Sequence, residues 1–180
     1  VNSDAVLISN VVAGNHSSGT TPGIHITGGS PRLLHTTIAD NTGADGSGVC
    51  LAQDYGTVST AVFTNTIISG QAVGITVTQG STATLYATLW DGNIANWGGL
   101  GAIKHTDDSS GDPAFVDTAS GDYHIGATSP AIDRGVDAGV STDIDGDVRP
   151  QGRAPDLGAD EYPSGVIGAY EVYLPVVLKR

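Results

Sequence analysis

Apolar and polar residues alternate in four short segments of the first hundred residues. The segments are residues 6–15, 33–41, 62–70 and 84–92, and they recur at steps of 26, 29 and 22 residues. A period of two places successive side chains on opposite faces of an extended chain. Each segment therefore predicts a β-strand with one apolar face and one mostly polar face.

Superposing the segments gives two apolar columns that should stack inside the fold. The columns are Ile8, Leu34, Phe63 and Leu85, and Val12, Ile38, Ile67 and Leu89. A second set of short apolar strands begins at Gly23, Gly48 and Gly74, with a weaker copy at Gly101. Such a repeat buries its apolar face only by stacking on its neighbours. The pattern predicts a coil of parallel strands, with one coil per repeat.

The repeats are similar to those of a known superfamily. The run containing Ile8, Asn10, Val12 and Asn15 resembles right-handed parallel β-helix repeats of the pectate-lyase-like superfamily, and the resemblance covers residues 5–105. It implies an all-β fold, namely a right-handed parallel β-helix (solenoid) of about four coils with an irregular C-terminal cap.

The repeat period ends near residue 106, where the charge also changes. Residues 1–106 contain 5 acidic and 2 basic residues, whereas residues 107–180 contain 14 and 5. The second part resembles the C-terminal segment of bacterial surface proteins known as the choice-of-anchor Q domain. The matching motifs are GDPAFVD (111–117), GDYHI (121–125), SPAIDRG (129–135), DIDGDVRP (143–150) and PDLGADEY (155–162). This resemblance implies a secreted or bacterial cell-surface protein and transfers no catalytic residue.

Three regions are therefore expected. Residues 1–106 should form parallel β-helix repeats, and residues 107–163 an acidic, loop-rich cap over the open end of the last coil. Residues 164–180 should form a terminal strand or an anchoring tail. The sequence contains no methionine, so we expect it to be the C-terminal part of a longer chain whose upstream β-helix coils are its first partner.

Composition narrows the classes of partner. The net charge of −12 disfavours nucleic acid and anionic membrane surfaces. No apolar run is long enough to span a bilayer. The single cysteine, Cys50, excludes an intrachain disulfide and a cysteine-rich zinc site.

Two acids are the candidates for catalysis. Asp40 and Asp91 occupy the same position in the aligned second and fourth segments, which places them on the order of 10 Å apart. That separation is near the upper limit for the two carboxylates of an inverting glycosidase. Both acids also lie in expected turns, where Asp is common. Pectate-lyase-like enzymes generally place Arg or Lys beside their acids, and the repeats contain only Arg32 and Lys104.

A second acidic group is a candidate calcium site. Three aspartates occupy every second position of one short stretch: Asp143, Asp145 and Asp147. An EF-hand is excluded because Ala154 stands where the loop requires glutamate, which leaves an irregular Ca²⁺ site as one alternative. In the other alternative, Arg149 and Arg153 pair with these acids, and with Asp160 and Glu161, and hold the cap together.

Other repeated polar residues are expected to be structural. His25 and Cys50 should stack on the polar face of successive coils, but Thr76 continues the column and a zinc site needs more ligands. Asparagines in or just after the strands should form ladders or occupy turns rather than line a sugar-binding cleft. They are Asn10, Asn15, Asn41, Asn65 and Asn93.

Two classes of function remain. The leading expectation is a structural or adhesive role in a surface protein, with a face that contacts polysaccharide or other surface components. No cofactor is expected, calcium being the one candidate. The alternative is an enzyme, a polysaccharide lyase or glycoside hydrolase of the pectate-lyase-like superfamily. An enzyme requires acids clustered with Arg or Lys on one exposed face.

Overall fold

A computed structural model describes residues 4–19, 21 and 23–163 of the protein. Nearly all regular structure within these residues is β-strand, and no α-helix occurs among them. Accordingly, no helix in this part of the chain has the length and hydrophobicity needed to cross a membrane. The predicted terminal strand or anchoring tail, residues 164–180, lies outside the described residues.

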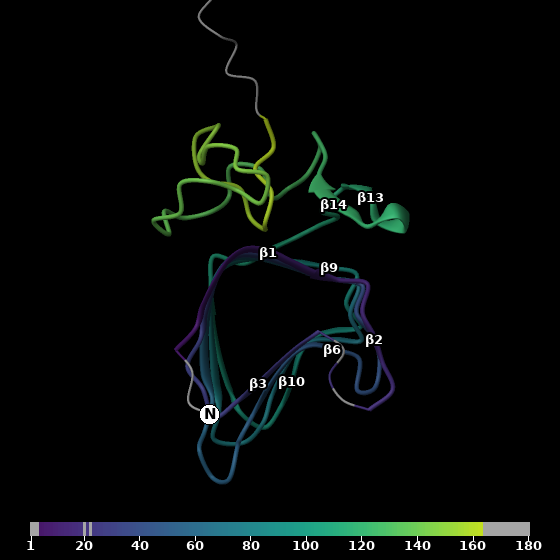
Figure 1. Cartoon of the computed structure of the whole chain (residues 1–180), viewed down its shortest axis with the longest axis vertical. Helices are drawn as coiled ribbons and strands as arrows, with labels where there is room; N and C mark the ends of the chain where they lie inside the picture. Colours follow the sequence, from purple (N-terminus) through teal and green to yellow (C-terminus); the bar gives the residue numbers. More distant parts are fainter. Residues whose placement is uncertain (1–3, 20, 22, 164–180) are drawn as a thin grey trace, which may run out of the picture.

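Two parallel sheets form the body of the protein (Figure 1). The larger sheet contains, in spatial order, β1 (Val6–Ala13), β4 (Arg32–Ala39), β7 (Thr60–Ser69), β9 (Thr82–Asp91) and β11 (Ala102–Thr106), with β12 (Ser109–Ser110) also beside β9. The smaller sheet contains β3 (Ile24–Thr27), β6 (Ser47–Ala52), β8 (Val73–Val77) and β10 (Ala95–Gly99). A short parallel pair consists of β2 (His16–Ser17) and β5 (Thr42–Gly43).

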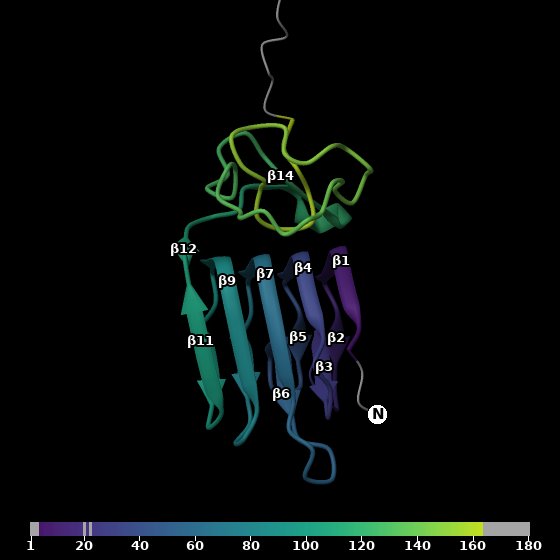
Figure 2. The same ribbon diagram turned by 90° about the vertical axis from the view of Figure 1, so that its left-hand side faces the viewer.

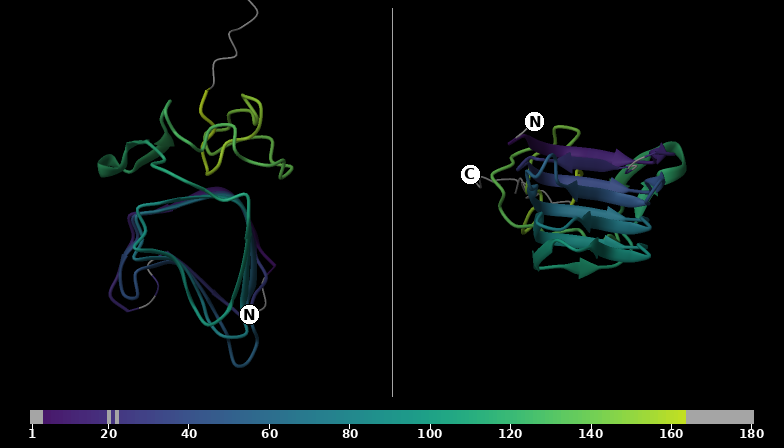
Figure 3. Two further views of the ribbon diagram at one scale, coloured as in Figure 1. Left: turned by 180° about the vertical axis from the view of Figure 1, so that it is seen from behind. Right: turned by 90° about the horizontal axis from the view of Figure 1, so that it is seen from below.

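The strands pair in the order in which they follow one another in the sequence. We call one strand of the larger sheet, together with the next strand of the smaller sheet, a pass of the chain. Successive passes overlie one another along the stacking direction, and the strands of one sheet lie side by side in the perpendicular view (Figure 3). The predicted parallel stacking of the repeats is therefore confirmed.

Each long strand of the larger sheet contains one residue with a left-handed backbone near its middle. These residues are Ser9, His35, Asn65 and Ala87, with φ of 50°, 50°, 57° and 57°. Left-handed backbone is unfavourable for most L-residues and is tolerated best by Gly, Asn and Asp. The chain bends there, and the second half of each strand continues in a new direction.

The observed register corrects the predicted columns by one residue. Columns through the larger sheet are Leu7, Leu33, Phe63 and Leu85, and Val12, Ile38, Ile68 and Trp90. Phe63 thus pairs with Leu33, not with Leu34 as predicted, and Ile8 is 48% exposed instead of internal. Adjacent apolar pairs such as Ile67–Ile68 are buried on both faces of the sheet, so alternation alone did not specify the register.

Ring side chains at the β11 end of the stack lie against one another and remain partly exposed, with Trp97 43% exposed. Trp97 pairs with Ile75 and His105 with Leu85, so both continue interior columns. Their ring centroids are 4.9 Å apart, and those of Trp97 and Trp90 are 5.8 Å apart. Asp108 accepts a hydrogen bond from Trp90 Nε1 at 3.0 Å and contacts His105 Nδ1 at 2.9 Å.

Residues 111–163, the flanking segment, lie along the side of the stack (Figures 1 and 2). The segment contains β13 (Phe115–Asp117), the 3-10 helix η1 (Thr118–Ser120) and β14 (Asp122–Ile125), and otherwise consists of turns and loops. Its apolar side chains pack on the outer face of β7 and β9, and the joint cluster comprises Ile67, Ala87, Leu89, Ile125, Ala131 and Leu157. The expectation that this region covers the open end of the last coil is therefore wrong. The outward side of the sheet is itself apolar and is buried by the segment.

Candidate functional site

The two acids predicted as a catalytic pair border one open pocket. Its volume is about 290 Å³, and it is lined by Asp40, Ser69, Asp91, Asp112, Pro113, Ala114, Phe115 and Thr118. The first three residues come from the larger sheet and the turns after its strands, and the others come from the flanking segment. The pocket is therefore formed only when the flanking segment lies against the sheet.

Register explains how the two acids reach the pocket. Asp91 ends β9 and pairs with Ser69, which pairs with Ala39, so Asp40 lies one position further along than Asp91. The prediction that the two acids occupy the same position is therefore wrong. As for the core columns, the observed register between the second and third passes differs by one residue from the predicted alignment. Asp40 has φ of 53° and its side chain extends over Gly70 of the next pass.

The carboxylates of the pocket are held by hydrogen bonds. Asp40 Oδ2 accepts a bond from the Tyr123 hydroxyl at 3.2 Å, and Asp91 Oδ2 accepts one from Ser69 Oγ at 3.3 Å. Asp112 Oδ1 accepts the backbone N–H of Ala114 at 2.8 Å. Burial and the Asp40 carboxylate raise the pKa of Tyr123, so this phenol remains a hydrogen-bond donor at neutral pH.

The charged side chains that line this pocket are all acidic. Its lining, taken from the described residues, includes three carboxylates and a serine but no Arg, Lys or His. Arg32 begins β4, at the opposite end of that strand from Asp40, and Lys104 lies in β11. The pocket therefore has hydrogen-bond acceptors for sugar hydroxyl groups but no cation to neutralise a uronate carboxylate.

The predicted calcium ligands do not converge on one point. Asp143 is buried, and its Oδ1 accepts the backbone N–H groups of Asp145 and Asp147 at 2.9 and 2.8 Å. Asp143 Oδ2 accepts the N–H of Glu161 at 3.0 Å, so both oxygens shape the loop. Asp145 instead contacts His124 Nε2 at 2.7 Å, and Asp147 is exposed.

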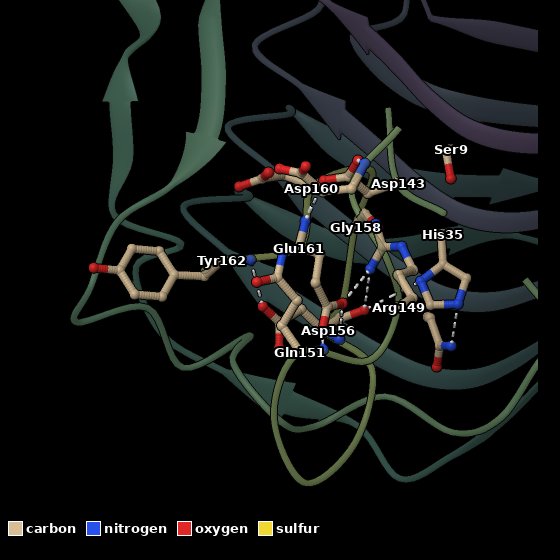
Figure 4. Close-up of polar contacts among 12 residues, drawn as sticks. Ser9, His35, Asp143, Arg149, Gln151, Asp156, Gly158, Asp160, Glu161 and Tyr162 are labelled. Atoms are coloured by element: carbon tan, nitrogen blue, oxygen red, sulfur yellow. Dashed lines mark hydrogen bonds and ion pairs between the residues drawn. The ribbon is translucent and has the colours of Figure 1, made fainter. Parts of the chain in front are cut away.

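Arg149, one of the two arginines predicted to pair with the acids, lies among the polar contacts of the flanking segment (Figure 4). Arg149 Nη1 donates to Glu161 Oε2 at 2.9 Å and to the Asp156 carbonyl oxygen at 3.2 Å, and Nη2 donates to the Gly158 carbonyl at 3.0 Å. Burial lowers the pKa of Arg149, while the Glu161 carboxylate acts to raise it. Arg153 forms no ion pair within the described part of the chain, and its backbone N–H donates to Asp133 Oδ1 at 2.6 Å.

A buried His–Asn pair joins the bends of the sheet to the flanking segment. His35 Nε2 lies 2.8 Å from Asn65 Nδ2, and His35 Nδ1 lies 3.1 Å from the Asp156 carbonyl oxygen. An amide donor on Nε2 and a carbonyl acceptor at Nδ1 assign the neutral imidazole with its proton on Nδ1. Asn65 also exchanges two hydrogen bonds with the backbone of Val136, at 2.7 and 2.8 Å. Burial and the charge of Arg149 lower the pKa of His35 to about 4.

The remaining repeated polar residues lie in columns along the stack or bond across its turns. His25, Cys50 and Thr76 form one column, and burial raises the pKa of the Cys50 thiol. Asn41 Oδ1 accepts the backbone and side-chain N–H groups of Asn15 at 3.2 and 2.8 Å. In the same way, Asn93 Oδ1 accepts the backbone N–H of Gln71 at 2.9 Å. These asparagines complete the turns between strands.

Sequence reasoning missed the residues that the flanking segment adds. Asp112 and Tyr123 meet Asp40 only through the docking of that segment, and Asn65 bonds to Val136, 71 positions away in the sequence. The motifs that contain Asp112 and Glu161 marked the segment, but nothing in a single sequence indicates which face of the sheet it covers.

Comparison with known proteins adds no assignment to these sites. No protein-family model matches the chain, and no curated protein or solved structure shows significant similarity to it. The function is therefore inferred from the register, contacts and charges described above.

Proposed function

We propose that this chain is a section of a right-handed parallel β-helix of the pectate-lyase-like type, with a C-terminal segment of the choice-of-anchor Q type. The parallel order of both sheets and the repeated left-handed bends support this architecture. The motifs between residues 111 and 162 support the C-terminal assignment. The parent protein is then a secreted or bacterial cell-surface protein, and its upstream coils would continue the stack.

The proposed role is structural and adhesive, with contact to carbohydrate at the acidic pocket. The observation that carries it is the pocket between Asp40, Asp91 and Asp112, which opens where two parts of the chain meet. Carboxylates accept hydrogen bonds from sugar hydroxyl groups and repel other anions. The expected ligands are therefore neutral or amino sugars rather than uronates.

Binding measurements with defined oligosaccharides test this role. We expect neutral or amino sugars to bind the intact chain in calorimetry or NMR titration, and oligogalacturonates not to bind. Asp91→Asn and Asp112→Asn should weaken binding at least tenfold. Asp107→Asn is the matched control, because Asp107 is exposed, has a positive φ that Asn tolerates, and lies outside the pocket lining. Unchanged binding in both pocket variants would refute the assignment.

The enzymatic alternative takes the form of a glycoside hydrolase rather than a lyase. One observation favours it, namely that Asp40 and Asp91 line the same pocket. A lyase acting on uronates would need a cation beside the substrate carboxylate, and the described lining has none. Reducing-end assays on neutral glycans test this alternative, and cleavage abolished by Asp40→Asn or Asp91→Asn would establish it.

A further inference from the structure

Three side chains from separate parts of the flanking segment converge near the outer side of β1. His124 lies on β14, Asp145 lies in the loop after Asp143, and Asp160 precedes Glu161. Each offers one ligand atom, and the three atoms lie within 4.8 Å of one another. We propose that His124, Asp145 and Asp160 bind a divalent transition metal of the zinc class. This site is separate from the acidic pocket and shares only Asp145 with the predicted calcium ligands.

The orientation of the histidine fits this role. The Asp122 carboxylate contacts His124 Nδ1 at 2.5 Å and also accepts the backbone N–H of His124 at 3.1 Å. A carboxylate on one ring nitrogen fixes the tautomer and directs the other nitrogen toward the ligand, as is usual for metal-binding histidines. In this protein the other nitrogen, Nε2, points to Asp145 Oδ2 at 2.7 Å.

The two carboxylates are also held in place. Asp160 is only 7% exposed, and its Oδ2 accepts the backbone N–H of Ile125 at 2.8 Å, which fixes it next to His124. Asp145 is more exposed, but its backbone N–H is bonded to Asp143 Oδ1 at 2.9 Å. One ligand would therefore be rigid, and the other would adjust as the metal enters.

The donor set selects the metal. One imidazole nitrogen and two carboxylate oxygens suit zinc and related transition metals, whereas Ca²⁺ and Mg²⁺ prefer oxygen ligands alone. With metal–ligand bonds of about 2.0–2.2 Å, tetrahedral ligand atoms lie about 3.3 Å apart. The 2.7 Å contact between His124 and Asp145 would open slightly, and the wider separations would close.

Space and charge are available for the ion. A cavity of about 170 Å³ borders all three residues and is also lined by Val11, Tyr123 and Ile144, which leaves room for water at a fourth position. Asp122 contacts the His124 imidazole and Asp143 lies near Asp160, so two further carboxylates add negative charge around the site. The rival arrangement is a metal-free ion pair in which a charged His124 bridges Asp122 and Asp145.

Metal titration of the intact chain distinguishes these two arrangements. After removal of metal by chelation, we expect calorimetry to show one Zn²⁺ per chain with a micromolar Kd, and Co²⁺ to give visible absorption bands of a His–carboxylate site. His124→Gln and Asp145→Asn should weaken Zn²⁺ binding at least tenfold. Millimolar Ca²⁺ should compete poorly.

Two matched controls separate this site from adventitious binding. His16→Gln removes an exposed histidine elsewhere, and Asp147→Asn removes an exposed acid two residues from Asp145. Neither change should alter Zn²⁺ affinity. Loss of affinity in the controls equal to that in His124→Gln, tighter binding of Ca²⁺ than of Zn²⁺, or no binding at all would overturn the proposal.

A measurement on the unsubstituted chain tests the site without requiring that any variant folds. Zn²⁺ should shift the imidazole ¹⁵N resonances of His124 at one equivalent, before those of the other histidines. Resonances of His124 that do not move while Zn²⁺ binds would assign the ion to another site and leave His124 in the metal-free ion pair.

Discussion

Arg149 and Glu161 form an ion pair with N–O distance of 2.9 Å in which the side chains are 0% and 1% exposed. Both groups also have backbone partners: Arg149 donates to two carbonyl groups, and Glu161 accepts the N–H groups of Gln151 and Asp156 at 2.8 and 2.9 Å. The pair therefore organises three stretches of a segment that has almost no regular secondary structure of its own.

Removing one partner of this pair should be strongly destabilising. Arg149→Ala leaves the Glu161 carboxylate buried without its cation, and we expect a loss of about 3–5 kcal/mol in the free energy of unfolding. Arg153→Ala is the control, since Arg153 is exposed, and it should change stability by no more than about 0.5 kcal/mol. Urea unfolding at pH 7 measures both. Equal, small losses would show that the pair does not hold the segment together.

Two buried groups should make opposite contributions to the pH dependence of stability. His35 has its pKa lowered from 6.5 to about 4, so the unfolded chain takes up a proton first and stability is lost as the pH falls from 6.5 to 4. Burial raises the pKa of Asp156 from 3.8 to about 6, so the folded chain takes up a proton first and stability is gained over nearly the same range. Each effect is on the order of 2–3 kcal/mol.

Single variants should reveal the two contributions. The stability advantage of the wild type over His35→Gln should shrink as the pH falls from 6.5 to 4, whereas its advantage over Asp156→Asn should grow. Denaturant unfolding at several pH values within that range measures both differences. Parallel pH profiles for all three proteins would be inconsistent with these shifts.

The observed register can be tested with two aliphatic residues. Leu33 is 1% exposed and lies in the column with Phe63, whereas Ile8 is 48% exposed. We expect Leu33→Ala to cost about 2–5 kcal/mol, as for other buried leucines. Ile8→Ala should cost less than about 1 kcal/mol, because much of its surface is already in water. The reverse order in thermal or urea unfolding would favour the register predicted from sequence.

Alanine substitutions at two glycines distinguish the effect of backbone strain from the effect of disturbing the acidic pocket. Gly70 and Gly92 both have positive φ, 71° and 58°, so an alanine at either should cost about 1–2 kcal/mol. Only at Gly70 would the added methyl group meet the Asp40 carboxylate, since the nearest atom at Gly92 is 3.6 Å away. Gly70→Ala should therefore weaken sugar binding more than Gly92→Ala, at similar stability. Titration of the two variants with the same oligosaccharide provides the comparison.

Alternation along the chain predicted the strands and their parallel stacking because each repeat has one face that water cannot reach. It did not predict the register between the second and third passes, since Leu33 and Leu34, like Ile67 and Ile68, are buried on opposite faces. A pattern in which both faces are apolar contains no information on which face is internal.

The candidate sites could be predicted only in part, for a related reason. Asp40 and Asp91 were identified from the repeat, and they do line one pocket, although at neighbouring positions of the register. Asp112, Tyr123 and His124 belong to the flanking segment, whose position on the sheet depends on long-range contacts such as that between Thr37 Oγ1 and the backbone N–H of Ala159, 3.0 Å. No local pattern encodes a contact of that range.

The lateral position of the flanking segment limits how the protein can change in length. The segment contacts the first pass at Ser9, the second at His35, the third at Asn65 and the fourth at Leu89. A repeat inserted between these passes would move its contacts apart by one strand spacing, about 4.8 Å, and break the polar ones. A repeat added before the first pass would leave all of them in place. Evolution can therefore vary the number of repeats freely on one side of this region, while insertions and deletions within it are selected against.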